Sequence, residues 1–169
     1  MSTSTLLKSL FEYKAWANRE LFAELETKLD GTQHPEAFRL CLRLLNHIYV
    51  VDQIFAAHLS GKPHGYAATN TPETPSLSEL REAVASCDAW YLSHIASLSE
   101  TQFEESLSFA FTDGERGRMS REEILAHIIT HGAYHRGAVG RVMAQLDVAP
   151  PRDILTRYLH QVEPERRAA

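Results

Sequence analysis

The chain has 169 residues, of which 44% are hydrophobic, and it carries 17 Lys or Arg against 22 Asp or Glu, for a formal net charge of −5. This length suits a single domain, residues 1–169. The sequence has no Lys/Arg run and no basic face, so we expect neither a nucleic acid nor an anionic membrane as a partner. No apolar stretch approaches the ~20 residues of a membrane span, and the N-terminus lacks the pattern of a signal peptide, so we expect a cytoplasmic protein.

Two long helices are predicted in the first 60 residues. Residues 3–28 repeat apolar side chains at helical spacing without Gly or Pro, and Asp30-Gly31 is a typical helix end. Pro35 can open the second helix at an early position, where its missing N–H costs nothing, and Gly61 ends it. The inward stripe of this second helix contains a histidine among apolar residues: Leu40, Leu44, His47, Val51 and Ile54.

The middle of the chain contains a loop followed by a third helix. Residues 61–76 are rich in Gly, Pro and Thr, and loops of this length are often lids or binding loops. His64 lies in this loop and is expected to be solvated. A capping box predicts that the third helix begins after Ser76 and runs to about residue 98. Cys41 and Cys87 fall inside helical patterns, which predicts buried reduced thiols rather than a disulfide.

The spacing of apolar residues changes twice in the last third of the chain. Residues 106–119 alternate apolar and polar side chains around Asp113-Gly114, which predicts a short hairpin or an extended connection. A long helix follows over 120–147, and a short final helix is expected near 154–159. Four long amphipathic helices predict an all-α four-helix bundle. Because the connections over 61–76 and 99–119 are long enough to cross the bundle, a simple up-down-up-down order does not follow.

Histidines on the predicted inward stripes carry the chemical signal. His131 and His135 lie one helical turn apart on one face of the last long helix, with Cβ atoms about 5–6 Å from each other. Together with His47 they place three imidazoles in an apolar core, which is costly unless a divalent metal ion satisfies their nitrogens. His127 extends the run, but it lies about 12 Å along the axis from His135, so one cation cannot bind both. His127 is therefore expected beside the site rather than in it.

Three imidazoles leave at least one metal position open, which is typical of catalytic rather than structural sites. Such a metal lowers the pKa of bound water or holds a thiolate, so a metal-dependent hydrolase and a thiol-dependent transferase are both consistent with the sequence. The alternative is a non-catalytic metal-binding or small-ligand-binding protein. A cavity above an open metal position would favour the enzyme, and a closed site the binding protein. Imidazole suits zinc, nickel, copper and iron alike, and no further catalytic or cofactor-binding residue is assigned.

Three segments resemble the DinB-like family, the damage-inducible proteins of bacteria, within the DinB/YfiT-like superfamily. They are EYKAWANRELF, LLNHIYVVDQIF followed by LSGKP, and HIITHGAYHRGAVG, and they span nearly the whole chain in the expected order. The resemblance implies a four-helix bundle with crossover connections that holds nickel or zinc through His47, His131 and His135. Related enzymes of the superfamily are thiol-dependent transferases and isomerases, so the resemblance also implies a low-molecular-weight thiol or another small-molecule substrate, and a stress-related role.

The resemblance also implies a homodimer, since members of the family commonly pair. Three apolar residues off the main stripes, Leu7, Phe22 and Phe38, are consistent with helix faces that meet a second copy. Beside the histidine pair, Arg136 is expected to form a salt bridge, with an anion clamp as the alternative. Gly137 is expected to permit close helix approach.

Overall fold

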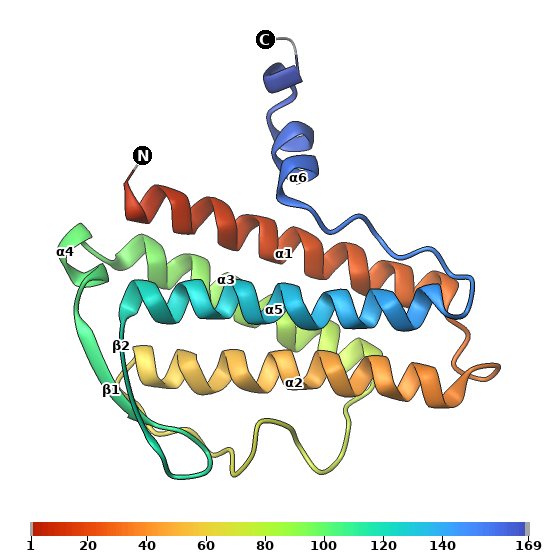
Figure 1. Cartoon of the computed structure of the whole chain (residues 1–169), viewed down its shortest axis with the longest axis horizontal. Helices are drawn as coiled ribbons and strands as arrows, with labels where there is room; N and C mark the ends of the chain where they lie inside the picture. The colour runs from red at the N-terminus through yellow and green to blue at the C-terminus, as the bar shows by residue number, and fades with distance from the viewer. Residues whose placement is uncertain (1, 168–169) are drawn as a thin grey trace.

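Four long helices run side by side along the molecule in the computed structural model, which describes residues 2–167 (Figure 1). A very short helix and a two-stranded hairpin lie between the third and fourth long helices, and a short helix and a 3-10 turn follow them. The elements are α1 (Thr3–Lys28), α2 (Pro35–Leu59), α3 (Leu77–Ser97), α4 (Glu100–Phe103), β1 (Ser106–Ala110), β2 (Arg116–Ser120), α5 (Arg121–Ala144), α6 (Leu155–Val162) and η1 (Pro164–Arg167). The predicted all-α bundle with a hairpin before the last long helix and a short C-terminal helix is confirmed.

Local side-chain chemistry sets where the long helices begin. Ser120 accepts a hydrogen bond from the backbone N–H of Glu123 at 3.2 Å, and the Glu123 carboxylate accepts one from the Ser120 N–H at 2.7 Å. Ser76 and Glu79 form the same reciprocal pair at the start of α3. α2 begins with Pro35, as its fixed φ and missing N–H predict. Each capping box satisfies two donors that a helix end would otherwise leave free.

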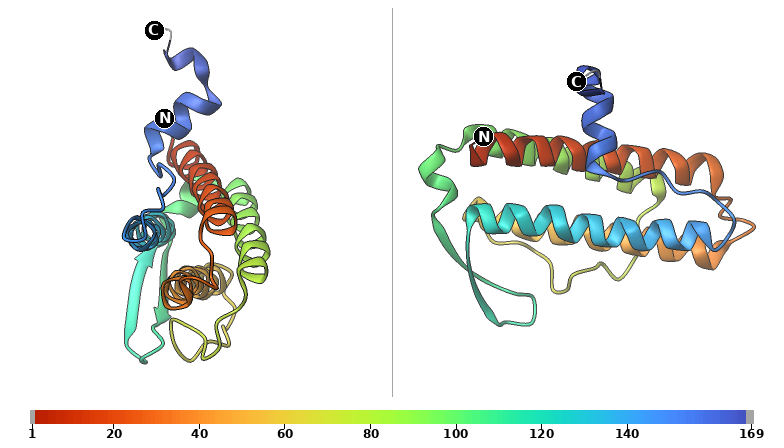
Figure 2. Two further views of the ribbon diagram at one scale, coloured as in Figure 1. Left: turned by 90° about the vertical axis from the view of Figure 1, so that its right-hand side faces the viewer. Right: turned by 45° about the horizontal axis from the view of Figure 1, so that its top comes forward.

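The order of the helices around the bundle differs from their order in the chain. α1 packs against α3 and α5, and α2 packs against the same two helices, so α1 and α2 occupy opposite corners (Figure 2, left). The connection over 60–76 runs back along the length of the bundle before α3 begins (Figure 1). The connection over 99–119 crosses one end of the bundle, because α3 ends and α5 begins at that end and the two helices occupy opposite corners (Figure 1).

The hairpin closes one side of the bundle beside α2 and α5 (Figure 2, left). Its strands are antiparallel, and Phe109 of β1 faces Gly117 of β2. A Cβ atom on Gly117 would lie 2.6 Å from the Phe109 ring, so only glycine lets that ring lie across the partner strand. Gly114 turns the chain with a φ of 91°, a left-handed conformation that favours glycine.

The core contains three apolar clusters, and a layer of polar side chains lies between the two largest. The first cluster contains Phe11, Phe55, Tyr91, Phe103 and Leu125 among others, and the second contains Leu25, Cys41, Leu45, Leu80 and Met143 among others. We call the buried residues between them the polar layer. Each long helix contributes to it: Lys14, Asn18, Asp52, Asp88 and Arg136. Both cysteines are buried and unpaired, as predicted.

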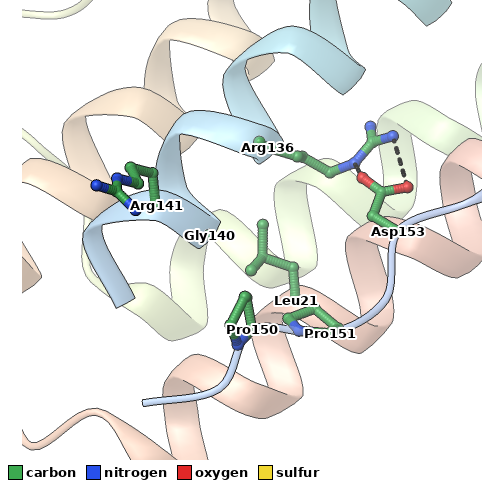
Figure 3. Close-up of a pocket in the computed structure, with 8 residues that line it drawn as sticks. Leu21, Arg136, Gly140, Arg141, Pro150, Pro151 and Asp153 are labelled. Atoms are coloured by element: carbon green, nitrogen blue, oxygen red, sulfur yellow. Dashed lines mark hydrogen bonds and ion pairs between the residues drawn. The ribbon is translucent and has the colours of Figure 1, made fainter. Parts of the chain in front are cut away.

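The C-terminal segment is fastened to the bundle at two points. Arg136 of α5 donates to the carboxylate of Asp153, with Nε 2.7 Å from Oδ2, beside Pro150 and Pro151 (Figure 3). This pair confirms the salt bridge expected for Arg136. Tyr158 of α6 then packs against Tyr13 and Trp16 of α1. Beyond these contacts, α6 and η1 project away from the bundle (Figure 1).

Two expectations about apolar residues need correction. Leu7 and Phe22, taken as dimer-facing residues, are only 5% and 2% exposed and belong to the core, and Phe38 packs against the second cluster. α2 has the length and apolarity of a membrane-spanning helix, with a mean hydropathy of 1.2 over its most apolar window, although the sequence was expected to contain no such stretch. In this fold α2 is a core helix, and 56% of that window is buried, which explains its composition.

Candidate metal centre

Two neighbouring helices bring the three predicted histidines together. His47 comes from α2, and His131 and His135 come from successive turns of α5. One potential ligand atom from each side chain lies within 4.8 Å of the others. All three residues are half-buried at the edge of the core, rather than on its most buried stripe as the sequence indicated. We call this group the three-histidine centre.

The distances within the three-histidine centre match those of a metal site. The Nε2 atoms of His47 and His131 lie 3.1 Å apart. Two ligands of a tetrahedral zinc ion, each about 2.05 Å from the metal, are separated by about 3.3 Å. The ring of His135 lies 4.6 Å from each of the other two ring centroids. The donor set therefore fits a single divalent cation without rearrangement of either helix.

The long connection over 60–76 orients His47. Nδ1 of His47 lies 2.7 Å from the backbone carbonyl oxygen of Thr69, which can only accept, so Nδ1 carries the proton and Nε2 keeps a lone pair. The connection is held there by α2 itself: Asn46 donates to the Thr71 hydroxyl at 2.6 Å, and Arg43 donates to the Thr71 carbonyl at 2.6 Å. The connection therefore fixes the orientation of the His47 ring.

Burial keeps His131 and His135 neutral. Burial, reinforced by His135, His47, His127 and Lys14, lowers the pKa of His131 to about 3. Burial and His47 also lower the pKa of His135. A neutral imidazole is the form that binds a metal, so these two residues need not lose a proton near pH 7.

The other histidines near the centre have different surroundings. The ring of His127 lies 5.4 Å from that of His131 and 5.1 Å from that of Phe55, and His127 stays outside the group of ligand atoms, as predicted. His64 was expected to be solvated, but this is wrong: its ring packs edge-on against His58 at 5.2 Å, and its Nδ1 atom is buried.

A cavity of about 320 Å³ adjoins the three-histidine centre. Its wall includes the ligands His47 and His131 but is otherwise mostly apolar, with side chains from α2, α5 and the hairpin. Its volume lies within the range of small-molecule sites. The remaining lining residues are Val51, Ile54, Phe55, His58, Thr69, Phe109, Ala110, Phe111, Thr112, Met119 and His127.

Comparison with known proteins places this arrangement in a family. The model of the DinB family matches residues 1–167. The chain belongs to the DinB family. Protein DinB of Bacillus subtilis (strain 168) is 25% identical over 164 residues, which cover 93% of this chain and 95% of that protein. No solved structure matches the chain.

The polar layer of this DinB-family chain was not predicted from the sequence. Nζ of Lys14 lies 2.8 Å from Oδ2 of Asp52 and 2.5 Å from Oδ1 of Asp88. Asn18 donates to the other Asp88 oxygen at 2.8 Å and accepts from Arg136 at 3.4 Å. The sequence does contain a sign of this layer. Positions 7, 11, 14, 18, 21 and 25 repeat at helical spacing, and two of them, Lys14 and Asn18, are polar.

The polar layer meets the three-histidine centre at Gly132. A Cβ atom on this glycine would lie 3.1 Å from Nη1 of Arg136 and 3.7 Å from Cε of Lys14. Gly132 therefore makes room for two buried cationic side chains directly beside His131. The expectation that Gly137 permits close helix approach is wrong, since a Cβ atom there would meet nothing within 4 Å.

Proposed function

We propose that this DinB-family protein is a divalent-metal-dependent enzyme whose ion, zinc or nickel, is held by His47, His131 and His135, and that it acts as a hydrolase. One observation supports the proposal most strongly: three imidazoles converge beside a cavity. Among the described residues, no fourth His, Cys, Asp or Glu joins the group, so a coordination position stays free for water or substrate.

The chain's own groups have separate roles in this proposal. A bound zinc or nickel ion supplies Lewis acidity and lowers the pKa of coordinated water toward ~7. The Thr69 carbonyl holds the His47 ring so that Nε2 faces His131, where it would be free to hold the ion. Val51, Phe55 and Phe109 form an apolar wall beside the ligands. This wall excludes bulk water and strengthens electrostatic interactions at the site.

Two other functions use the same ligands. A thiol-dependent transferase would place the sulfur of a low-molecular-weight thiol on the free metal position. A non-catalytic metal-binding protein with a stress-related role needs no substrate space, and the adjoining cavity therefore favours an enzyme over it. Cobalt-substituted protein tests the transferase: a thiolate on the metal would give a new charge-transfer absorption band when glutathione is added, and the absence of this band would count against a glutathione-dependent transferase.

The ligand set is tested by metal analysis of protein purified without a histidine tag. We expect about one zinc or nickel ion per chain. His135→Ala should weaken zinc binding more than about 100-fold, since the loss of an outer-shell partner alone costs 10–100-fold, while the helix content measured by circular dichroism stays unchanged.

The matched control is His127→Ala, which removes an imidazole one turn from His131 that lies outside the group of potential ligand atoms. Zinc affinity measured by calorimetry should change less than tenfold. Equal losses in the two variants would contradict the assignment of His135 as a ligand. Catalysis is tested with p-nitrophenyl esters: zinc-loaded protein should hydrolyse them, and chelator-treated protein and His135→Ala should not.

A further inference from the structure

We propose that the cavity beside the three-histidine centre binds the apolar body of a substrate that has a single metal-binding head, and that this substrate is an acyl compound, such as a medium-chain carboxylic ester or amide. This inference rests on the proposed metal-dependent function and names its substrate class. It follows from the shape of the cavity, its wall and the distribution of charge around it.

The cavity is elongated along α2. His47, Val51, Ile54 and His58 all line it, and they share one face of that helix. Their eleven-residue span corresponds to about 16 Å at 1.5 Å per residue. The metal ligand His47 lies at one end of this row and His58 at the other. A ligand anchored at the metal can therefore extend along the helix, which suits a chain-like body.

The hairpin supplies the opposite wall with aromatic and thioether side chains. Phe109 and Phe111 lie in edge-to-face contact, with ring centroids 5.2 Å apart, and Met119 lies on the partner strand. Phe109 is buried, whereas Phe111 is 45% exposed. Phe111 is thus one of the few large apolar side chains left in solvent, and it lies on the wall of this cavity.

The charge of the wall limits what can occupy the cavity. Not one of its thirteen lining residues is Asp, Glu, Lys or Arg. A ligand with a second charged group in its body would leave that group buried and unpaired, at a cost of several kcal/mol. Three neutral histidines leave the full positive charge of a divalent ion for the head. The site therefore favours an oxygen-donor head on an uncharged body, and disfavours phosphorylated or zwitterionic bodies.

The test measures how affinity depends on chain length in zinc-loaded protein. Acetohydroxamate and octanohydroxamate carry the same metal-binding head, and isothermal titration calorimetry gives both dissociation constants. A fully buried methylene contributes about 0.8 kcal/mol, or about fourfold in affinity, so octanohydroxamate should bind more than about 100-fold tighter. Equal affinities would overturn the inference and leave the metal site intact. Failure to bind zinc would instead overturn the proposed function.

A charged probe tests the wall without any mutation. Suberic acid monohydroxamate has the same head and length as octanohydroxamate, but it ends in a carboxylate. It should lose most of the gain from the long chain, because that carboxylate would be buried without a partner. Affinity equal to that of octanohydroxamate would show that the tail stays in solvent and would refute the inference.

A matched pair of variants locates the tail. Phe111→Ala removes an exposed aromatic ring from the cavity wall, and Leu40→Ala removes an exposed apolar side chain that does not line the cavity. Phe111→Ala should keep its affinity for zinc and acetohydroxamate and lose about tenfold for octanohydroxamate, whereas Leu40→Ala should bind all three as the parent does. An unchanged octanohydroxamate affinity in Phe111→Ala would place the tail elsewhere.

Discussion

Lys14 holds a positive charge inside the bundle because two carboxylates face its ammonium group. Burial favours the neutral amine, but Asp52 and Asp88 outweigh burial and raise the pKa of Lys14. The side chain of Lys14 is fully buried, and that of Asp52 is 2% exposed. Because these groups are buried away from water, each charge is stabilised mainly by the opposite charges beside it. Removal of one group leaves its partner as an uncompensated buried charge.

We expect Lys14→Met to destabilise the protein by about 3–5 kcal/mol, since it leaves two buried carboxylates without their cation. Urea unfolding followed by circular dichroism measures the change. The triple variant Lys14→Met, Asp52→Asn, Asp88→Asn removes all three charges and should recover much of the loss. A single variant as stable as the parent would show that the polar layer is solvated.

The clustering of the three histidines could be predicted from their positions in the sequence, whereas metal binding by them stays a prediction. His47, His131 and His135 stand on apolar stripes, and a histidine there needs a partner. Lys14 and Asp52 also stand on buried stripes, but a lysine at such a position is usually read as a break in the pattern. Its partner is on another helix, and the sequence does not state which helices are neighbours.

Gly132 and Gly137 lie in the same helix but in opposite environments. A methyl group at Gly132 would press on the Arg136 guanidinium at 3.1 Å, and that group is held by Asp153 and cannot move freely. At Gly137 there is open space. The two positions therefore separate the packing cost of an added methyl group from the helix propensity that it brings.

Gly132→Ala should destabilise the protein by about 1–2 kcal/mol, because overpacking outweighs the gain in helix propensity. Gly137→Ala should stabilise it by up to about 1 kcal/mol, because only the propensity changes. Chemical denaturation of both variants gives the comparison. A stabilising effect at both positions would mean that α5 stands further from α1 than the structure indicates.

The residues at which the long helices begin could be predicted from local side-chain chemistry. The face that α5 turns toward the core could not be predicted along its whole length. Ser120 and Glu123 mark the start of α5 because a capping box is a local arrangement. Ile124 and Ile128 of the predicted stripe are fully buried, but beyond them the buried residues of α5 are Ile129, Gly132, Arg136, Val139 and Met143. The sequence instead indicated a stripe through the histidines, about a quarter turn away. Arg136 is buried because Asp153 reaches it from the C-terminal segment, and such a long-range pair leaves no local pattern.

The whole molecule should lose stability in mild acid when it is free of metal. Burial lowers the pKa of His94, of His127 and, with His64, of His58, and that of His131 falls to about 3. In the unfolded chain a histidine has a pKa of about 6.5. Below this pH the unfolded state takes up protons that the folded state does not, so the free energy of unfolding falls.

Urea unfolding with a chelator at pH 7.5 and at pH 5.0 measures this effect, and the protein should be less stable at pH 5.0. Burial also raises the pKa of Asp52 to about 6. That shift acts in the opposite direction, because the folded state then takes up a proton at a higher pH than the unfolded state does. It concerns one group, whereas five histidines have a lowered pKa, His135 included. Greater stability at pH 5.0 would mean that Asp52 dominates the proton balance.

A homodimer stays a prediction that rests on family membership, since Leu7 and Phe22 proved to be core residues. We expect light scattering at micromolar concentration to give twice the chain mass of 19.1 kDa. A mass of 19.1 kDa would contradict the prediction. The large apolar side chains that are exposed, such as Leu6, Leu40 and Ile154, are the ones to examine for a shared surface.

The polar layer also sets the axial alignment on which the three-histidine centre depends. His47 lies on one helix and its two companions on another, so a slip of α2 past α5 by a single turn would displace His47 by about 5.4 Å. Leucine and isoleucine layers tolerate such a slip, because one apolar side chain can replace another. A slip would also drag Asp52 away from Lys14 and into the apolar clusters on either side. The ion pair therefore allows only one axial register of α2 in the bundle. A metal site shared between α2 and α5 needs that register to be fixed.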